Sequence, residues 1–209
     1  MTDLYFVRHC QSESNVIQVF AGTTDFDISE QGAKQLLYLR EAFKDVHLDK
    51  VYSSPLIRAR KTADALNFYP GAPVETRECF REMDMGDYET VPVHSMKEND
   101  LYLWKEHPER FVSPNGESTR HVAERAYEGL LKVCAENPGK TVAIATHGGV
   151  LRFLFRILKG LPEERTKEVP WSDNTAVYHV RYEDDGTFTI LFENNTKHLP
   201  KELFSDWKD

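Results

Sequence analysis

Short apolar runs alternate with helical patterns along this chain. Residues 4–7, 50–53 and 141–146 form runs of strand-forming residues, and the last run is followed by His147-Gly148-Gly149. Runs of this length and composition are typical of the buried strands of a parallel sheet. The pattern therefore predicts a strand at each of these three positions.

Four helices are predicted in the intervening segments. Ser29 is a suitable N-cap, with Gly32 in the first turn and apolar residues following at helical spacing. A second helix is expected to start near Pro55, and a third after Ser118, where an apolar stripe runs to the helix-ending Asn137-Pro138-Gly139. A fourth is expected over residues 150–158. The order is mostly β-α-β-α, which predicts a three-layer α/β/α sandwich with a mostly parallel sheet.

The C-terminal part of the chain carries a different signal. Residues 175–182 and 187–193 flank the turn residues 183–186, which predicts a hairpin and hence one antiparallel strand at the sheet edge. Residues 91–115 mix three prolines with aromatic residues and have no clean period, so we expect a lid-like insertion that covers one end of the sheet. No repeat or linker divides the chain, and a single domain over residues 1–209 is predicted.

Composition narrows the class of protein. The chain has 209 residues, of which 40% are hydrophobic and 29% charged, enough for one ordinary domain with a substantial core. Lys and Arg number 26 and Asp and Glu 34, a net charge of −8, which argues against a nucleic-acid or membrane-surface partner. Three cysteines without CxxC spacing favour a reducing compartment. With no targeting segment or long apolar stretch, we expect a cytoplasmic protein.

Two histidines lie where the predicted strands end. His9 and Arg8 follow the first strand, and His147 follows the strand over residues 141–146. A lone histidine at such a place is more often an ordinary loop residue. Two at equivalent strand ends favour a site, because open α/β sheets bind ligands outside the carboxyl ends of their strands.

A third strand end adds positive charge to this edge. Arg58 would lie in the first turn of the helix that starts near Pro55, whose N-terminus also favours an anion. Guanidinium groups match phosphate oxygens and stay charged at any working pH. The sequence therefore predicts a local positive pocket that binds a phosphate group.

These residues resemble the signature of a known family. The segment Val7-Arg8-His9-Cys10-Gln11-Ser12-Glu13-Ser14-Asn15 is similar to V-R-H-G-x-[ST]-x-x-N of the histidine phosphatase superfamily, in its phosphoglycerate mutase-like branch. Further blocks follow in family order at residues 20–25, 29–32, 53–63, 82–89, 116–118 and 146–149. Together they span nearly the whole chain, so the resemblance is specific and implies a phosphoglycerate mutase-like fold.

The resemblance also implies a role for each matching residue. His9 would be the nucleophile that becomes phosphohistidine, and Glu82 would be the proton donor to the leaving oxygen and then the base that activates water. The phosphate group would be bound by Arg8, Ser12, Asn15, Gly22, Arg58, His147 and Gly148. No metal and no cofactor are implied.

Elementary chemistry agrees with these roles. Imidazole attacks phosphorus only when one ring nitrogen is unprotonated, and nearby cations help because they disfavour the protonated imidazolium. The other ring nitrogen needs a hydrogen-bond acceptor that fixes the tautomer. Fixed cations also stabilise the charge on the equatorial oxygens during phosphoryl transfer. Glu82 is singled out only by its position relative to Gly86 and Glu89, since other carboxylates crowd the same stretch.

Several alternatives stay open at this stage. Cys10 replaces the usual glycine and is either a buried inert thiol or an oxidant-sensitive one. A cysteine-dependent phosphatase loop, H-C-x5-R, is excluded because Val16 occupies the arginine position. The acidic stretch 82–90 and the short length favour hydrolysis of a small-molecule phosphate ester over cofactor-dependent mutase activity, and both are favoured over a non-catalytic phosphate-binding module.

The substrate and the oligomeric state are not determined, and a homodimer is left open. Five residues of the insertion either contact the non-phosphate part of the substrate or only pack within the lid. They are His94, Lys97, Tyr102, Trp104 and Lys105.

Overall fold

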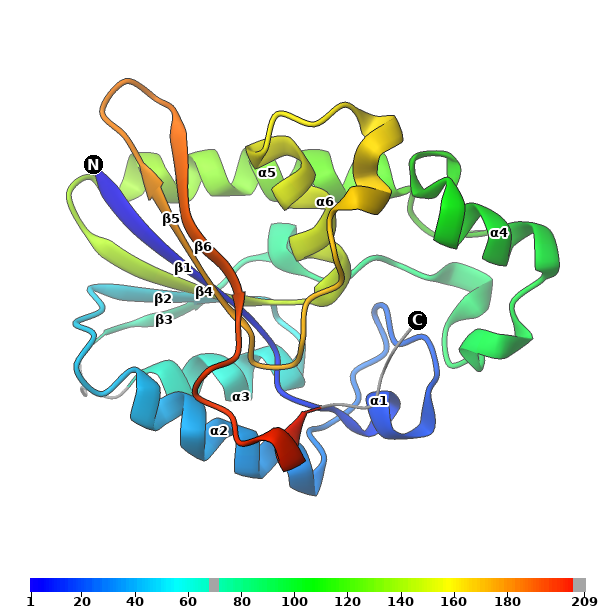
Figure 1. The fold of residues 1–209 in the computed structure, drawn as a ribbon, viewed down its shortest axis with the longest axis horizontal. Helices are drawn as coiled ribbons and strands as arrows, with labels where there is room; N and C mark the ends of the chain where they lie inside the picture. The colour runs from blue at the N-terminus through cyan, green and yellow to red at the C-terminus, as the bar shows by residue number, and fades with distance from the viewer. Residues whose placement is uncertain (68–71, 205–209) are drawn as a thin grey trace.

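The central element of the fold is a six-stranded sheet with the strand order β3-β2-β4-β1-β5-β6. The computed structural model describes residues 1–67 and 72–204 (Figure 1), so residues 68–71 and 205–209 of the predicted domain lie outside the described part. The strands are β1 (Thr2–Arg8), β2 (Lys50–Ser53), β3 (Val74–Thr76), β4 (Thr141–Thr146), β5 (Val177–Tyr182) and β6 (Phe188–Asn195). The three strands predicted from apolar runs are all present.

The strand directions agree with the predicted sheet, except that the antiparallel strand is not the one at the edge. Strands β1, β2, β3 and β4 pair in parallel, whereas β5 pairs antiparallel with both β1 and β6. The predicted mostly parallel sheet with an antiparallel edge is confirmed. The strand that runs in the opposite direction is β5, and the second strand of the predicted hairpin, β6, forms the edge outside it.

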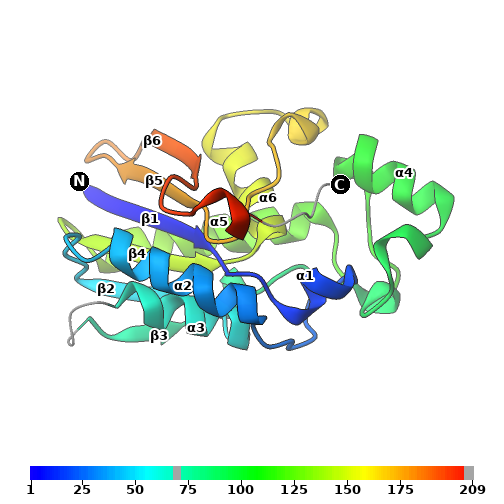
Figure 2. The same ribbon diagram turned by 60° about the horizontal axis from the view of Figure 1, so that its bottom comes forward.

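Alternating side chains of the strands enter two separate cores. Phe6 of β1 and Ile144 of β4 belong to the core beneath α5 (Thr119–Glu136) and α6 (Gly148–Leu158). Val7 and Ala145, one position further along each strand, belong to the core shared with α2 (Glu30–Ala42) and α3 (Ile57–Leu66). Since successive residues of a strand point to opposite faces, this pattern places one helix pair on each face (Figure 2). The predicted three-layer sandwich is confirmed.

The starts of the helices agree with the capping signals. The side chain of Ser29 accepts a hydrogen bond from the amide of Gly32, and that of Ser118 accepts one from the amide of His121. Helix α6 begins at Gly148, two residues before its predicted start, because the glycine pair forms its first turn. Glycine is a poor helix former, so the apolar pattern began only at Val150.

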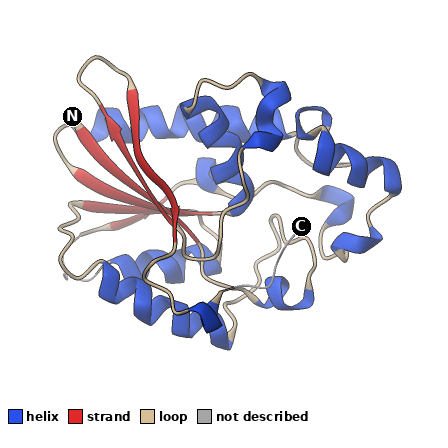
Figure 3. Ribbon diagram, viewed as in Figure 1, coloured by secondary structure: helices blue, strands red, loops and turns tan. Residues whose placement is uncertain are grey.

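Some elements had no clear signal in the sequence. The segment 91–115 contains α4 (Glu98–Glu106), and it lies beyond the carboxyl ends of the parallel strands (Figure 3). Strand β3 also went unpredicted. The remaining elements are α1 (Glu13–Ile17) and the short 3-10 helices η1 (Glu78–Phe80), η2 (Gly86–Tyr88), η3 (Val93–Ser95), η4 (Pro108–Arg110), η5 (Glu163–Glu168) and η6 (Lys201–Leu203). Of the helices described, none is long and apolar enough to cross a membrane.

Candidate active site

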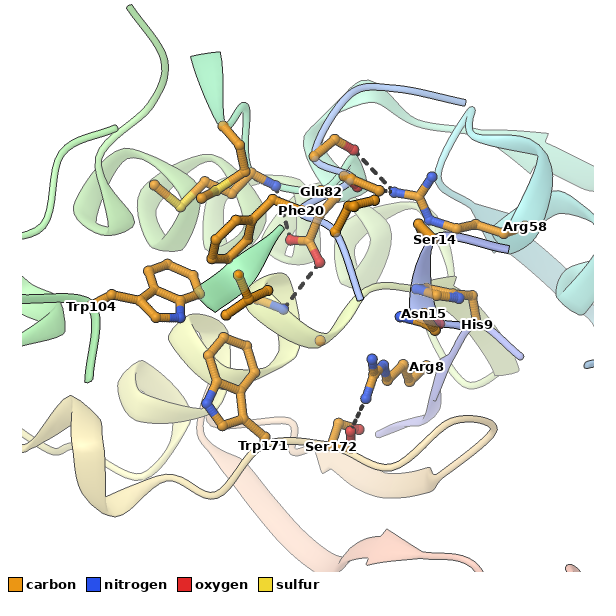
Figure 4. Close-up of a pocket in the computed structure, with 18 of the residues that line it drawn as sticks. Arg8, His9, Ser14, Asn15, Phe20, Arg58, Glu82, Trp104, Trp171 and Ser172 are labelled. Atoms are coloured by element: carbon orange, nitrogen blue, oxygen red, sulfur yellow. Dashed lines mark hydrogen bonds between the residues drawn. The ribbon is translucent and has the colours of Figure 1, made fainter. Parts of the chain in front are cut away.

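The parallel strands bring both predicted histidines to the same edge of the sheet. Arg8 pairs with Thr146, and the ladder continues for one more residue, because the amide of His9 donates to the carbonyl of Thr146 at 2.8 Å. The ring centroids of His9 and His147 are 5.1 Å apart. A cavity of about 150 Å³ opens at this edge (Figure 4). It is lined by Arg8, His9, Ser14, Asn15, Val19, Phe20, Ala21, Gly22, Arg58, Glu82, Met83, Met85, Val93, Trp104, Gly148, Gly149, Trp171, Ser172 and Asp173.

His9 is held as an oriented, neutral imidazole. Its Nδ1 lies 2.6 Å from the carbonyl oxygen of Cys10. A carbonyl only accepts hydrogen bonds, so Nδ1 carries the proton and Nε2 keeps its lone pair. Burial, together with the charges of Arg58 and Arg8, holds the pKa of His9 well below its ordinary value of 6.5. The ring is therefore a nucleophile at neutral pH.

Arg58 and Arg8 are fixed by backbone carbonyls. The guanidinium of Arg58 donates to the carbonyls of Ala21, Gly22 and Thr24, and that of Arg8 donates to the carbonyl of Ser172. These bonds hold both cations at the cavity in advance of ligand binding. The N-terminus of α3, which was expected to attract the anion, is instead occupied by Asp25, whose carboxylate accepts from the amide of Ile57 at 2.7 Å.

Asn15 presents its amide nitrogen to the cavity. Its Oδ1 accepts from the amide and the hydroxyl of Ser12 at 3.1 and 3.0 Å, and from Nδ2 of Asn174 at 3.4 Å. The oxygen is thus satisfied within the protein, which leaves Nδ2 as a donor toward a ligand. Ser12 does not line the cavity, since its hydroxyl is turned onto the start of α1, and it acts on the site through Asn15.

Glu82 lies over the N-terminus of α6. Its two carboxylate oxygens accept from the amides of Met83 at 2.9 Å and Gly149 at 3.2 Å. A Cβ at residue 149 would lie 2.6 Å from Oε1 of Glu82, so only glycine allows this approach. Glu82 alone among the carboxylates of the stretch 78–89 lines the described cavity.

The other carboxylates of this stretch have structural partners. Glu89 accepts from the amides of Thr23, Thr24 and Met85, and these hydrogen bonds join two loops of the cavity wall. Burial works to raise the pKa of Glu89, but these bonds and one from the hydroxyl of Thr24 outweigh it and lower the pKa. The loops meet closely at Gly22, where a Cβ would lie 2.1 Å from the carbonyl oxygen of Met83.

His147 is not among the residues that line the cavity, although its ring lies next to that of His9. Its Nε2 is 2.7 Å from the hydroxyl of Ser54, and its buried Nδ1 has no hydrogen-bond partner among the described residues. Burial, together with the charges of Arg58 and His9, lowers its pKa well below 6.5. The following residue, Gly148, lines the cavity itself.

Cys10 is turned away from the site. It is fully buried, its backbone amide donates to the hydroxyl of Thr62, and burial raises the pKa of its thiol to about 12. A thiol with this pKa is almost entirely protonated at neutral pH. The structure therefore favours the inert thiol over the oxidant-sensitive one.

The end of the cavity away from His9 is aromatic, which the sequence analysis largely missed. Of the five candidates in the insertion, only Trp104 lines this cavity, and Lys105 lines a neighbouring one. The loop 171–174 contributes Trp171, Ser172 and Asp173. The sequence held a signal for the loop 171–174. The strand that follows it, β5, belongs to the predicted hairpin and is antiparallel to β1, so the loop before that strand must lie at the edge of the sheet where β1 ends.

A neutral, oriented histidine between two fixed arginines and facing a carboxylate is a site suited to phosphoryl transfer. The chain matches the model of the histidine phosphatase superfamily (branch 1) over residues 4–196, and it belongs to this family. Among the described residues, no group of three or more His, Cys, Asp or Glu side chains is placed to hold a metal ion.

Named relatives and solved structures agree with this assignment. The chain is 32% identical over 160 residues to the phosphatase PhoE of Bacillus subtilis, covering 77% of this chain and 79% of that protein. It is 30% identical over 202 residues to phosphoserine phosphatase 1 of Hydrogenobacter thermophilus, covering 95% of each. The structure of Bacillus stearothermophilus YhfR superposes with a TM-score of 0.90 at 27% identity, covering 95% of this chain and 99% of that one. The predicted family, fold class and phosphatase activity are confirmed.

Proposed function

We propose that this phosphatase hydrolyses phosphate monoesters of small molecules in two steps through a phosphohistidine at Nε2 of His9. The observation that carries the proposal is the 2.6 Å contact between Nδ1 of His9 and the carbonyl of Cys10, which leaves Nε2 unprotonated. In the first step the Nε2 lone pair attacks phosphorus and the ester P–O bond breaks. In the second, a water oxygen attacks phosphorus, the P–N bond breaks, and inorganic phosphate leaves.

Glu82 moves the proton in both steps. As a carboxylic acid it gives its proton to the leaving ester oxygen, and as a carboxylate it then takes a proton from the attacking water, which restores its starting state. Its position supports this role, because amides of Met83 and Gly149 fix both of its oxygens at the cavity.

The phosphate oxygens would be bound by fixed donors. Arg8 and Arg58 supply charge, Nδ2 of Asn15 supplies a further hydrogen bond, and Gly148 lines the cavity at the start of α6. His147 does not line the cavity, but its Nδ1 without a partner and its ring 5.1 Å from that of His9 support a contact with a phosphate oxygen. Because these groups are oriented in advance, little reorganisation is needed when charge develops in the transition state. The segment 91–115 would form the opposite wall of the site.

The cysteines support a proposal for the compartment in which the enzyme acts. Cys10, Cys79 and Cys134 are free thiols in the structure. We place the enzyme in a reducing compartment, the cytoplasm, with a small phosphate ester as its partner.

The test of the proposed function is His9→Ala. We expect turnover of p-nitrophenyl phosphate to fall on the order of 10⁴-fold or more, because the nucleophile is lost, while the circular dichroism spectrum stays unchanged. The matched control is His47→Ala, which removes an exposed histidine and should leave turnover unchanged. Retained activity in His9→Ala would contradict the mechanism, as would loss of wild-type activity in EDTA.

A second measurement separates hydrolase from mutase. Reactions with a phosphorus-labelled substrate, stopped in alkaline detergent because the P–N bond is labile in acid, should trap a phosphoramidate in the wild type and none in His9→Ala. Adding 2,3-bisphosphoglycerate to 3-phosphoglycerate should yield inorganic phosphate. Formation of the 2-phospho isomer instead would show mutase chemistry.

A further inference from the structure

The cavity has two ends of different chemistry. The positive end holds His9, Arg8 and Arg58, and Figure 4 shows Trp104 and Trp171 at the opposite end. Phe20, Trp104 and Trp171 form this second end, called the aromatic end below. The other large apolar side chains in the cavity lining are Val19, Met83, Met85 and Val93.

The rings of the aromatic end are fixed by packing. Trp104 is 8% exposed, and its indole lies edge-on to Phe20 at 5.8 Å, to Phe111 at 5.0 Å and to Phe153 at 6.4 Å. Trp171 lies 5.4 Å from Trp104. Little conformational entropy would be lost when a ligand packs against rings that are already ordered, so this wall is preorganised for a flat apolar group.

Trp171 is held from a second direction. The guanidinium of Arg152, one turn along α6 from Gly148, lies 4.5 Å from the centre of the Trp171 ring. A cation over an indole face orients the ring. Arg152 and Lys105 line a separate cavity that shares the two indoles.

The charges of the cavity argue against a second anionic group on the substrate close to the phosphate. Within the described lining, the cationic side chains are Arg8 and Arg58, both at the positive end. The other charged groups are the carboxylates of Glu82 and Asp173. A substrate carboxylate among the apolar side chains of this cavity would lose its water without gaining a cation from the lining of the same cavity, because Arg152 and Lys105 line the neighbouring cavity instead.

We propose that the alcohol part of the preferred substrate is an uncharged aromatic group bound by Phe20, Trp104 and Trp171. The inference rests on the proposed function, since it takes the phosphate to be bound at His9. It assigns the enzyme to aryl and arylalkyl phosphate monoesters, and it distinguishes this site from one built for a small phosphorylated acid.

The first experiment compares benzyl phosphate with glycerol 3-phosphate and phosphoserine. All three release an alkoxide of similar basicity, so the ratio of kcat/KM values reports binding of the alcohol part and not the ease of bond breaking. We expect benzyl phosphate to be preferred by about ten- to a hundredfold, the range expected for burying a small ring. Equal kcat/KM values, or a preference for phosphoserine, would overturn the proposal. The proposed function would still stand if p-nitrophenyl phosphate were hydrolysed in a His9-dependent reaction.

The second experiment removes one ring. Trp171 is only partly buried, so Trp171→Ala should still fold. We expect it to lower kcat/KM for benzyl phosphate about tenfold, chiefly through KM, and to leave phosphoserine within about twofold. Trp171→Phe should keep most of the preference.

The control for the second experiment is Tyr102→Ala. Tyr102 lies on α4 like Trp104, but it is 53% exposed and does not line the cavity. The substrate ratio should be unchanged in this variant. If Trp171→Ala weakened both substrates equally, the ring would only support the fold and the proposal would be wrong.

Discussion

The hydrogen bonds of His9 fix which ring nitrogen is protonated, whereas those of Glu82 fix the position of its carboxyl group. His9 donates to a carbonyl, which keeps one nitrogen free for attack. Glu82 accepts from the amides of Met83 and Gly149, which hold its carboxyl group at the place where a leaving oxygen would lie. These positions support the proposal that His9 attacks phosphorus and that Glu82 transfers the proton.

Glu82→Gln tests this division at the level of single residues. The amide keeps the shape of the side chain but cannot give up a proton in the same way. We expect kcat/KM to fall about 10²- to 10³-fold for benzyl phosphate, whose alkoxide needs a proton, and by much less for p-nitrophenyl phosphate. Steady-state kinetics with both substrates measures the difference.

The matched control is Asp87→Asn in the same loop. Asp87 is exposed and accepts from the side chain of Asn115, outside the cavity. It should leave both substrates unaffected. Equal losses for the two substrates in Glu82→Gln would show that Glu82 is not the acid.

Sequence patterns could predict part of the site because those residues lie next to strand ends. Arg8 ends β1 and His9 follows it, and Gly148 comes two residues after the end of β4, so their convergence follows from a parallel sheet. Trp171 and Trp104 come from a loop and from the insertion, and their contact arises only when both segments fold over the sheet. No local pattern encodes such a contact. A motif can also place a residue correctly without giving its contact. Ser12 occupies the expected motif position, but its hydroxyl donates to Oδ1 of Asn15 and does not line the cavity.

At the scale of elements, α5 anchors the loop that carries Glu82. Arg125 of α5 donates to the carbonyls of Cys79 at 2.8 Å and Glu82 at 3.1 Å, and it forms two hydrogen bonds with the carboxylate of Glu117. Glu117 in turn accepts from the amide of Asp84 at 2.8 Å. This pair, in which Glu117 is buried and Arg125 half-buried, therefore holds the loop on both sides of Glu82.

Breaking the pair should loosen the loop. We expect Arg125→Met to lower the free energy of unfolding by about 3 kcal/mol, because the carboxylate of Glu117 is left buried without its cation. The second change Glu117→Gln should recover part of the loss. Urea unfolding measures both. In the same variant the hydrolysis of benzyl phosphate should fall more than that of p-nitrophenyl phosphate.

The control is Arg120→Met on the same helix. Arg120 pairs with Glu163 at the surface, and such pairs contribute little. We expect no measurable change in stability or activity. If Arg125→Met behaved like this control, the anchoring role of α5 would be wrong.

Elements were predictable where burial is regular. Helices α2 and α5 have serine caps and continuous apolar stripes, and both were found. Strand β3 has three residues at the sheet edge, largely exposed, so no apolar run marks it. Helix α4 buries Trp104 alone among its nine residues, and neighbouring prolines hide its period. Its place is set by contacts with the rest of the molecule.

For the whole molecule, burying two neutral histidines links stability to pH. The pKa values of His9 and His147 are held well below 6.5 in the folded protein, first by burial and then by neighbouring cations. Below pH 6.5 the unfolded chain binds protons at these two residues that the folded protein does not. Unfolding therefore becomes easier as the pH falls, and the stability present above pH 6.5 is lost.

The pH range can be chosen so that histidines dominate this loss. Glu89 and Glu117 are carboxylates whose pKa is lowered in the folded protein. Their contribution to the free energy of unfolding is lost mainly when the pH falls below 4.5, the ordinary pKa of glutamate. Between pH 7.5 and 5.0 the change therefore reports the histidines. His9 and His147 each contribute about 1.4 kcal/mol per pH unit below 6.5, so the two together lose about 4 kcal/mol by pH 5.0. Burial also lowers the pKa of the half-buried His198 to about 4, which adds a further, smaller loss of the same sign.

Urea unfolding at pH 7.5 and 5.0 measures this loss in the wild type and in His9→Asn. The variant has one buried histidine fewer, so its loss over the same range should be about 2 kcal/mol smaller than that of the wild type, whatever its stability at pH 7.5. Equal stability of the wild type at the two pH values would contradict the linkage. An undiminished loss in His9→Asn would show that His9 is not one of the groups responsible, and that its ring is protonated in the folded protein at pH 5.0.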